Sequence, residues 1–468
     1  MPFCGSLTGV KFVGRKAERS LLESQFAAPR SAFVPIYGRR RVGKSELILQ
    51  FVEGKKAIYH VGKTAPAGLQ LRELLQQMAR VLDEPLLENL PTDNWRTVFD
   101  EITRRSRNTK LVLAFDEFQW LVQAAPELPS LLQEFWDRHW SRSNDIMLIL
   151  CGSYIGFMER EVLGSKSPLF GRRTAQIRLA PFSYLEAREF HPRWSVTDQA
   201  SLYFLCGGVP HYLKVFDPDR SLASNVESVF LNEFSPLFRE PDFLLREELR
   251  EVDCYYAILL AIAEGQSTLA AIASRSSVPE RSIPYYIQQL VELGYVARYH
   301  ALTEKPANAR HVRIRLEDPL LRFWFRFVFP NMSFLQQMGA ARTFRERIKP
   351  ELPAYLGQMF ERLCREALPR MYARENVPAP FAIGEYWDKA AQIDVVGLRQ
   401  DGWTDLGECK WGPIRSVSAV EAELETKVSL YPNGRNATIG RRIFSHHPVK
   451  NPGKGVRWTT LQELYELE

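Results

Sequence analysis

Residues 38–45 read Gly-Arg-Arg-Arg-Val-Gly-Lys-Ser, after an apolar run typical of a strand and before apolar residues at helical spacing. This is the pattern of a phosphate-binding loop (P-loop) between a strand and a helix. Gly38 and Gly43 let the backbone curl, so that its N–H groups point at a phosphate. Lys44 is expected at the β- and γ-phosphates, and Ser45 on Mg²⁺. The pattern predicts an α/β domain that binds ATP and Mg²⁺.

The composition is that of a globular protein, with 45% hydrophobic and 25% charged residues in 468. This length provides for about three domains of roughly 150 residues. The net charge of +6 permits an acidic polymer as partner without demonstrating one. Six scattered cysteines without a CxxC pair indicate reduced thiols, and we find no signal-peptide pattern and no apolar run of a membrane span. We therefore expect a cytoplasmic protein without a membrane partner.

Apolar runs alternate with amphipathic segments over about the first 210 residues, which is typical of a parallel sheet covered by helices. The runs at 32–37, 111–115 and 146–150 are nearly continuous, as in strands buried on both faces. The pattern then becomes helical, and from about residue 350 a new α/β unit begins. The predicted organisation is a P-loop core (1–195), a helical lid (196–250), a winged helix-turn-helix (251–320), a connector (321–349) and a C-terminal α/β domain (350–468).

Asp116 and Glu117 directly follow the apolar run at 111–115. The carboxyl end of a parallel strand faces the nucleotide crevice. Downstream of a P-loop we expect Asp116 to hold Mg²⁺ through its water shell and Glu117 to orient or deprotonate the attacking water. The alternative is a solvated strand end.

Three further residues are candidates for the nucleotide site. Ser153 follows the run at 146–150 and could sense the γ-phosphate, or it could form a plain Gly-Ser turn. Arg172 and Arg173 could neutralise charge in the transition state, or they could be surface residues. An arginine that acts on a neighbouring subunit would require a homo-oligomer, so the oligomeric state stays open.

Residues 251–320 predict a winged helix-turn-helix. Helical patterns at 255–264, 269–274 and 282–293 come before strand patterns at 295–299 and 312–316, with a wing around residues 304–306. The hairpin is basic, and a basic wing can lie along phosphates. The alternative is a solvated hairpin or one that docks another domain. The basic residues are Arg298, Lys305, Arg310, Arg313 and Arg315.

A second acidic group lies near the C-terminus. Asp394 and Glu408 fall on two predicted strands joined through a turn at 400–402. A three-residue loop places these carboxylates directly opposite each other, and a two-residue loop shifts the pairing by one. Alternation places Lys410 on the same face as Glu408. Glu361 flanks the apolar stripe of the preceding helix, 355–368, and could reach the site.

Clustered carboxylates favour a bound cation, and their hard oxygens suit Mg²⁺, with Mn²⁺ as a substitute. A lysine beside that ion can position a water for attack on a phosphodiester. The nearby Glu385 and Asp388 are expected to be solvated, and His446 and His447 complete no metal-ligand spacing. Asp394 and Glu408 are therefore the predicted metal ligands, with Lys410 and Glu361 beside them.

These motifs resemble known families. The Gly14-Arg15 region, the P-loop, the Asp116-Glu117 pair, Ser153 and the 207–210 segment resemble prokaryotic AAA-type ATPases of the STAND group, more narrowly DEXX-box ATPases with a winged helix and a nuclease-like C-terminal domain. The resemblance implies that Arg15 lies near the adenine and that Pro210 belongs to the lid. Asp394, Glu408 and Lys410 resemble the core motif of the PD-(D/E)XK nuclease superfamily, which has a restriction-endonuclease-like fold.

The sequence therefore favours an ATPase that couples its nucleotide state to nucleic-acid binding, DNA being the expected partner, and to metal-dependent phosphodiester cleavage. The first alternative is a nucleotide-controlled switch whose C-terminal domain binds without cutting. A DNA translocase is a third hypothesis, and it would require hydrolysis stimulated by long duplexes.

Overall fold

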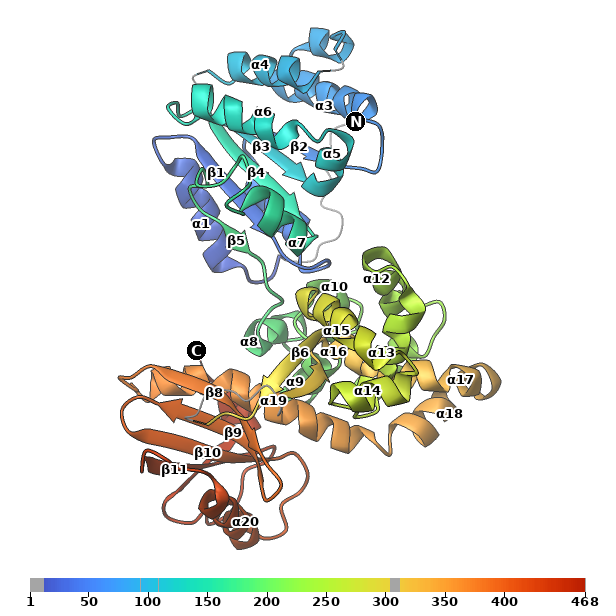
Figure 1. Cartoon of the computed structure of the whole chain (residues 1–468), viewed down its shortest axis with the longest axis vertical. Coiled ribbons are helices and arrows are strands. Elements are labelled where there is room, and N and C mark those ends of the chain that lie inside the picture. The colour runs from blue at the N-terminus through green and yellow to red at the C-terminus, as the bar shows by residue number, and fades with distance from the viewer. Residues whose placement is uncertain (1–11, 93, 108, 304–311, 468) are drawn as a thin grey trace. The chain divides into compact units, whose positions relative to one another are not determined.

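The structure, a computed structural model, describes residues 12–92, 94–107, 109–303 and 312–467 (Figure 1). The chain divides into two compact units. The first ends at residue 181 and also includes 209–211, and the second comprises 182–208 and the chain from 212 onward. The predicted domain boundaries at 195, 250, 320 and 349 stay predictions.

The first unit is built on a five-stranded, all-parallel sheet in the order β2-β3-β4-β1-β5. The residues of the three central strands are all buried, because helices cover both faces. In this order β4 separates β1 from β3, so the ends of all three strands meet at one edge. The strands are β1 (Ala32–Tyr37), β2 (Ala57–Val61), β3 (Leu111–Asp116), β4 (Ile146–Gly152) and β5 (Ile177–Arg178).

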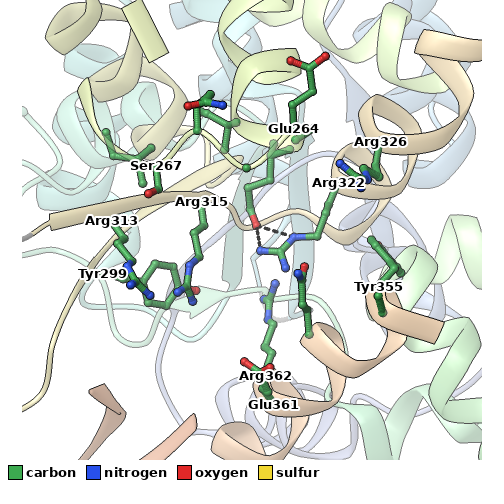
Figure 2. Close-up of a pocket in the computed structure, with 18 of the residues that line it drawn as sticks. Glu264, Ser267, Tyr299, Arg313, Arg315, Arg322, Arg326, Tyr355, Glu361 and Arg362 are labelled. Carbon is green, nitrogen blue, oxygen red and sulfur yellow. Dashed lines mark hydrogen bonds between the residues drawn. The ribbon is translucent and has the colours of Figure 1, made fainter. Parts of the chain in front are cut away.

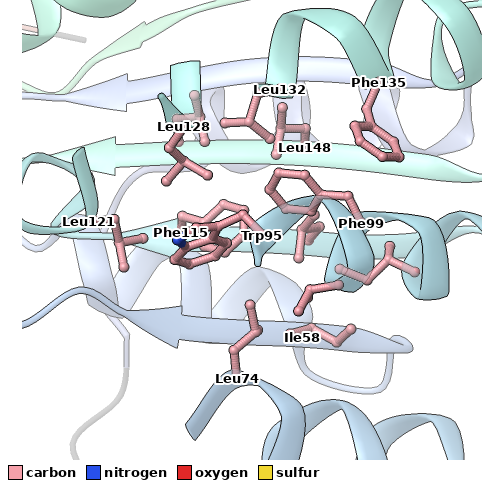
Figure 3. Close-up of a cluster of buried hydrophobic side chains, with 14 of the residues drawn as sticks. Ile58, Leu74, Trp95, Phe99, Phe115, Leu121, Leu128, Leu132, Phe135 and Leu148 are labelled. Atoms are coloured by element: carbon pink, nitrogen blue, oxygen red, sulfur yellow. The ribbon is translucent and has the colours of Figure 1, made fainter. Parts of the chain in front are cut away.

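Alternate side chains along the central strands point to opposite faces of the sheet, where they belong to two separate hydrophobic cores. On one face, Ile58, Phe115 and Leu148 pack against Leu74 of α3 and Phe99 of α4, as Figure 3 shows. The other face packs against α1 and α2. The helices are α1 (Lys16–Ala27), α2 (Lys44–Val52), α3 (Ala67–Leu82), α4 (Trp95–Arg105), α5 (Phe118–Ala124), α6 (Leu128–Phe135) and α7 (Ile155–Phe157).

The three strands predicted from apolar runs are confirmed, as is the helix that begins at Lys44. The apolar runs predicted neither β2 nor β5. In β2 the burial alternates and Tyr59 and His60 interrupt the apolar run, while β5 has only two residues.

The second unit begins with short helices. Their N-termini are well capped: Ser183, Ser195 and Ser221 each accept a hydrogen bond from a backbone N–H of the following turn. The helices of this part of the chain are α8 (Tyr184–Ala187), α9 (Val196–Cys206), α10 (Pro210–Leu213), α11 (Leu222–Phe230) and α12 (Glu240–Glu248).

Three helices and an antiparallel hairpin follow, in the order expected for residues 251–320. Its identity as a winged helix stays a prediction, and the expected wing tip with Lys305 and Arg310 lies outside the described residues. The elements are α13 (Val252–Ala263), α14 (Leu269–Ser276), α15 (Ile283–Glu292), β6 (Val296–His300) and β7 (Val312–Leu316).

An aromatic-rich helical segment then leads to α19 (Leu352–Arg374), the long helix expected before the C-terminal strands. Trp324, Phe325 and Phe327 of this segment are buried. The segment comprises α16 (Pro319–Phe323), a π-helical turn (Trp324–Val328), α17 (Met332–Met338) and α18 (Ala340–Thr343).

The C-terminal part is a mixed five-stranded sheet in the order β12-β11-β10-β9-β8, on which α19 packs. Strands β8, β9 and β10 pair antiparallel, and β10, β11 and β12 pair parallel. An α/β fold is thus confirmed, and a restriction-endonuclease-like fold stays a prediction. The elements are β8 (Phe381–Trp387), β9 (Gln392–Arg399), β10 (Trp403–Lys410), α20 (Val417–Leu430), β11 (Thr438–Ser445), β12 (Val456–Thr460) and α21 (Leu461–Tyr465).

Among the described residues, no helix combines the length and the apolar character that crossing a bilayer requires.

Candidate functional site

The P-loop connects β1 to α2, as predicted. A Cβ at Gly38 would lie 2.2 Å from the carbonyl oxygen of Leu179, so only glycine fits there. Gly43 caps α2 with a φ of 90°, a left-handed conformation that favours glycine. The turn leads directly into the first turn of α2, where free backbone N–H groups and the helix dipole attract an anion.

Lys44 is held inside this loop. Its side chain is 6% exposed, and Nζ donates hydrogen bonds to the carbonyl oxygens of Gly38 (2.9 Å) and Arg39 (3.0 Å). Burial lowers the pKa of Lys44, against the opposing effect of Glu117 and Asp116. Among the described residues its hydrogen-bond partners are carbonyl oxygens, and an ammonium at this position can donate to phosphate oxygens instead.

Asp116, at the end of β3, is the centre of a hydrogen-bond cluster. Its Oδ2 accepts hydrogen bonds from Ser45 Oγ and from Tyr59 Oη, each at 2.6 Å. Its Oδ1 accepts the N–H of Glu117 at 2.9 Å. The structure therefore brings together the two residues predicted to bind Mg²⁺ at the P-loop. Tyr59 was not anticipated, because its strand β2 was not predicted.

Glu117 and Ser153 meet because β4 lies beside β3. Ser153 Oγ donates to Glu117 Oε2 at 2.7 Å, and Gln119 Nε2 donates to the same oxygen. Glu117 itself has a φ of 48°, which turns the chain sharply after β3. The side chain predicted to activate water is thus fixed by two donors.

Arg15 and Pro210 both lie near the P-loop. Arg15 is 5% exposed, and its Nη2 donates to the carbonyl oxygens of Val42 (3.1 Å) and Ala180 (2.7 Å). Pro210 Cγ lies 3.6 Å from the position of a Cβ at Gly43. Arg15 therefore links the P-loop at Val42 to the segment at Ala180. Its expected nearness to an adenine stays a prediction.

The two candidate arginine fingers differ. Arg172 donates two hydrogen bonds to the carboxylate of Asp137, at 2.8 and 2.7 Å, so within this chain it is committed to a surface ion pair. Arg173 is exposed. Among the residues that the structure describes, neither arginine forms a hydrogen bond with the cluster around Asp116.

The second acidic group forms on β9 and β10. The pairing of Gly407 with Val395 continues to place Glu408 opposite Asp394, which is the three-residue-loop alternative. Both carboxylates are buried, at 8% exposure for Asp394 and 1% for Glu408. Asp394 Oδ2 accepts the N–H of Cys409 at 3.0 Å.

Two lysines approach Glu408. Lys427 Nζ lies 2.7 Å and Lys410 Nζ 3.5 Å from its Oε2, and both lysines also pair with Glu423. Burial and the nearby Asp394 raise the pKa of Glu408 to about 7, although Lys427 opposes the shift. Lys427 and Glu423 were not anticipated. They are four residues apart on α20, and a Glu and a Lys at this spacing lie on the same face of a helix and can form an ion pair.

Glu361 joins the same group from α19. Burial and the proximity of Asp394 raise its pKa to about 8. Arg365, one turn further along the helix, donates to the carbonyl oxygen of Asp394 at 2.5 Å. Asp394 therefore acts electrostatically on both other acidic residues singled out from the sequence, Glu361 and Glu408.

The expectation that Glu385 is solvated is wrong. It is 1% exposed and forms an ion pair with Arg315 at 2.6 Å. The β8–β9 register shifts between Gly384 and Tyr386, and such a bulge redirects the side chain at its centre. Asp388 is exposed, as expected, although its carboxylate accepts hydrogen bonds from neighbouring residues.

The donor set at β9 and β10 fits a hard divalent cation with few protein ligands. Glu408 Oε1 is buried without a hydrogen-bond partner among the described residues. Within the same residues, no three His, Cys, Asp or Glu side chains form a cluster that could hold a metal ion by themselves. A cation bound by Asp394 and Glu408 would therefore complete its shell with waters or substrate, as Mg²⁺ commonly does.

The arginines of the β6–β7 hairpin have partners within the second unit. Arg298 donates to Gln288 at 2.8 Å, and Arg313 lies over the ring of Trp387, with Cζ 4.4 Å from the centroid. The Arg313–Trp387 contact and the Arg315–Glu385 pair join the hairpin to β8, which favours the alternative that the hairpin docks another domain. Contact of this hairpin with DNA stays a prediction.

Comparison with known proteins supports the nucleotide site. Residues 12–216 match an ATPase domain that is predominantly archaeal, and residues 324–422 match a domain of archaeal and bacterial proteins of unknown function. An uncharacterized ATP-binding protein of Methanocaldococcus jannaschii, MJ0423, is 47% identical over 47 residues, which are 10% of this chain and 80% of that protein.

The Walker-type ATPase PABY2304 of Pyrococcus abyssi is a similar solved structure, with a TM-score of 0.51 and 20% identity over 67% of this chain and 96% of that one. This likeness supports the fold. The uncharacterized protein MJECL04 of M. jannaschii is 30% identical over 424 residues, 90% of this chain and 92% of that protein. The chain therefore belongs to the family of MJECL04, and its N-terminal part is an ATP-binding P-loop ATPase domain.

Proposed function

We propose that this ATPase uses its nucleotide state to control metal-dependent cleavage of nucleic acid, DNA in the first place, by the C-terminal sheet domain. The observation that carries the proposal is the pairing of buried Asp394 and Glu408 across β9 and β10, with Lys410 on the same face. Helix α19 adds Glu361. This arrangement resembles the PD-(D/E)XK nucleases, as the sequence suggested.

At the P-loop, Lys44 would contact the β- and γ-phosphates, while Ser45 and Asp116 would hold Mg²⁺. Glu117 would orient or deprotonate water, and Ser153 would link its carboxylate to the γ-phosphate. Resemblance to the STAND group supports a switch in which ATP and ADP favour different conformations. A finger role for Arg172 or Arg173 would need a neighbouring subunit of a homo-oligomer.

At the C-terminal site, Asp394 and Glu408 would hold Mg²⁺ or Mn²⁺. The bound ion would supply Lewis-acid stabilisation of charge on the phosphodiester. Lys410 would position the attacking water, and Glu361 would adjoin the two carboxylates from α19, where burial and Asp394 raise its pKa. The predicted winged helix would bind the nucleic acid beside this domain.

A regulatory switch with a non-cleaving domain is the second candidate, and one observation favours it. Lys427 lies 2.7 Å from Glu408 Oε2, in the place where a cation would contact this carboxylate. An ammonium there can substitute for a metal ion and leave a folded but inactive site. Calorimetric titration separates the candidates: Mn²⁺ binding that is lost in Asp394→Asn supports the nuclease, and no binding to the unmodified protein supports the switch.

The decisive experiment is a cleavage assay on single- and double-stranded DNA and RNA, with Mg²⁺, Mn²⁺ or EDTA, and with or without ATP. We expect cleavage that depends on the metal ion. Asp394→Asn and Lys410→Met should abolish this cleavage, and in Lys44→Ala the cleavage should no longer respond to ATP. Asp253→Asn, an exposed site on α13, is the matched control. Cleavage that survives in both site variants would refute the nuclease assignment without affecting the ATPase.

A further inference from the structure

A cavity of about 740 Å³ lies within the second unit, between the β6–β7 hairpin, α13, the aromatic segment and α19. This volume is in the range of small-molecule sites. Figure 2 shows arginine side chains that reach into it from β7, from the aromatic segment and from α19. The arginines that line it are Arg313, Arg315, Arg322, Arg326, Arg362 and Arg365.

Only part of this positive charge is neutralised by carboxylates. Arg315 and Arg365 both pair with Glu385, Arg362 pairs with Glu317, and Arg326 pairs with Glu351. Of the acidic residues on the wall, Glu264 pairs with Arg275 outside the cavity, and in Figure 2 its carboxylate points away from the arginines.

Arg322 and Arg313 have no carboxylate partner in the ion pairs formed by the described residues. Arg322 donates to the carbonyl oxygen of Leu316 through Nε (3.1 Å) and Nη2, and its Nη1 lies 3.4 Å from the sulfur of Met359. Arg313 is half-buried; it donates to the side-chain oxygen of Gln392 at 3.3 Å and lies over the ring of Trp387. Burial of a guanidinium that lacks a counter-ion is costly. An anion in the cavity would offset that cost.

We infer that this cavity binds the phosphate groups of a nucleotide. Planar guanidinium groups bind phosphate oxygens through paired hydrogen bonds, and converging arginines suit an anion with more than one phosphate. Ser267, Gln266 and Gln358 add polar groups that can bind a base or a sugar. The volume of the cavity suits one or two nucleotides and is too small for a double helix.

Two sources provide this chemistry: a free nucleotide, or the single-stranded end of a nucleic acid. Glu361 is on the wall of the cavity, so a strand end bound there would lie beside the acidic group of β9 and β10. That second possibility rests on the proposed nuclease function. Binding of phosphates by the cavity requires neither cleavage nor a metal ion.

The test uses full-length Lys44→Ala protein in EDTA, so that neither the P-loop nor a divalent cation contributes. Three probes are titrated and followed by calorimetry or fluorescence anisotropy: inorganic tripolyphosphate, adenosine triphosphate, and a labelled single-stranded DNA hexamer. We expect saturable binding that weakens about tenfold or more in Arg322→Gln and in Arg313→Gln, since each removes a charged donor pair. Arg345→Gln, an exposed arginine outside the cavity, is the control.

Tighter binding of the small phosphates identifies a free nucleotide as the ligand, and tighter binding of the hexamer identifies a strand end. Arg313→Gln guards against misfolding of Arg322→Gln, and circular dichroism checks both. Absence of binding by all three probes, or equal binding by the arginine variants and the control, would overturn the inference. Asp394→Asn separates it from the nuclease proposal, because that variant should retain binding even where cleavage is lost.

Discussion

Ser153 Oγ donates a 2.7 Å hydrogen bond to Oε2 of Glu117, across the boundary between β4 and β3. Gln119 Nε2 donates to the same oxygen. The carboxylate expected to activate water is therefore fixed by neutral donors, and it lies beside Asp116, which bonds to Ser45 of the P-loop at 2.6 Å. This chain of contacts links the P-loop, the acidic pair and the end of β4. Substitutions along it should therefore affect ATP binding and ATP hydrolysis to different extents.

Glu117→Gln should abolish hydrolysis while leaving ATP binding intact. The amide keeps the size of the side chain but cannot accept a proton, and loss of a general base typically costs about 10²- to 10⁴-fold in rate. Steady-state phosphate release gives the rate, and calorimetry gives the affinity. Lys44→Ala is the contrasting variant, because it should lose binding as well. Hydrolysis at the unmodified rate in Glu117→Gln would exclude Glu117 as the base.

Ser153→Ala should slow hydrolysis much less. The substitution removes one of two donors to Glu117, so the carboxylate stays in place but is less well oriented. We expect kcat to fall about tenfold, with little change in KM, since a hydrogen bond to a charged group contributes about 1.5 kcal/mol at the lower end of its range and the second donor remains. Ser167→Ala is the control, because that hydroxyl donates to the carbonyl of Glu161 instead. A defect as large as that of Glu117→Gln would indicate a direct role for Ser153.

Much of the nucleotide site could be predicted because its signals are local. A P-loop, an apolar strand that ends in Asp116-Glu117, and a second that ends before Ser153 can each be recognised within a few residues. The strand order places these ends at one edge of the sheet. Tyr59 could not be found this way, because β2 alternates in burial and the partner Asp116 is 57 residues away.

At the C-terminal site, period-two alternation predicted that Asp394 and Glu408 lie near each other, and the register stayed open between two loop lengths until the strand pairing decided it. The contact between Lys427 and Glu408 could not be predicted, because Lys427 lies on α20 and the sequence does not show how that helix packs on the sheet. Glu385 was wrongly expected in solvent because a bulge breaks the alternation of β8. Local periodicity thus predicts strand partners, whereas ion pairs between elements depend on tertiary packing.

Lys427→Met should strengthen Mn²⁺ binding at the Asp394–Glu408 pair severalfold. The ammonium lies 2.7 Å from Glu408 Oε2 and competes with a cation for that oxygen. Titration calorimetry at fixed pH measures the affinity, and Lys389→Met, an exposed lysine, is the control. Weaker binding in Lys427→Met would mean instead that the lysine holds Glu408 in the conformation that binds the metal.

His60 should make the first unit less stable in mild acid. It is 1% exposed on β2, and burial lowers its pKa from 6.5 to about 4, because the imidazolium would lose its hydration. Between those pH values the unfolded chain takes up a proton that the folded chain excludes. The free energy of unfolding should therefore fall by about 3 kcal/mol as the pH decreases from 6.5 to 4, and level off below. Urea unfolding of the full chain at several pH values measures this. His60→Phe should flatten that part of the dependence, whereas His139→Phe, at an exposed position, should leave it unchanged; equal profiles for all three proteins would contradict the prediction.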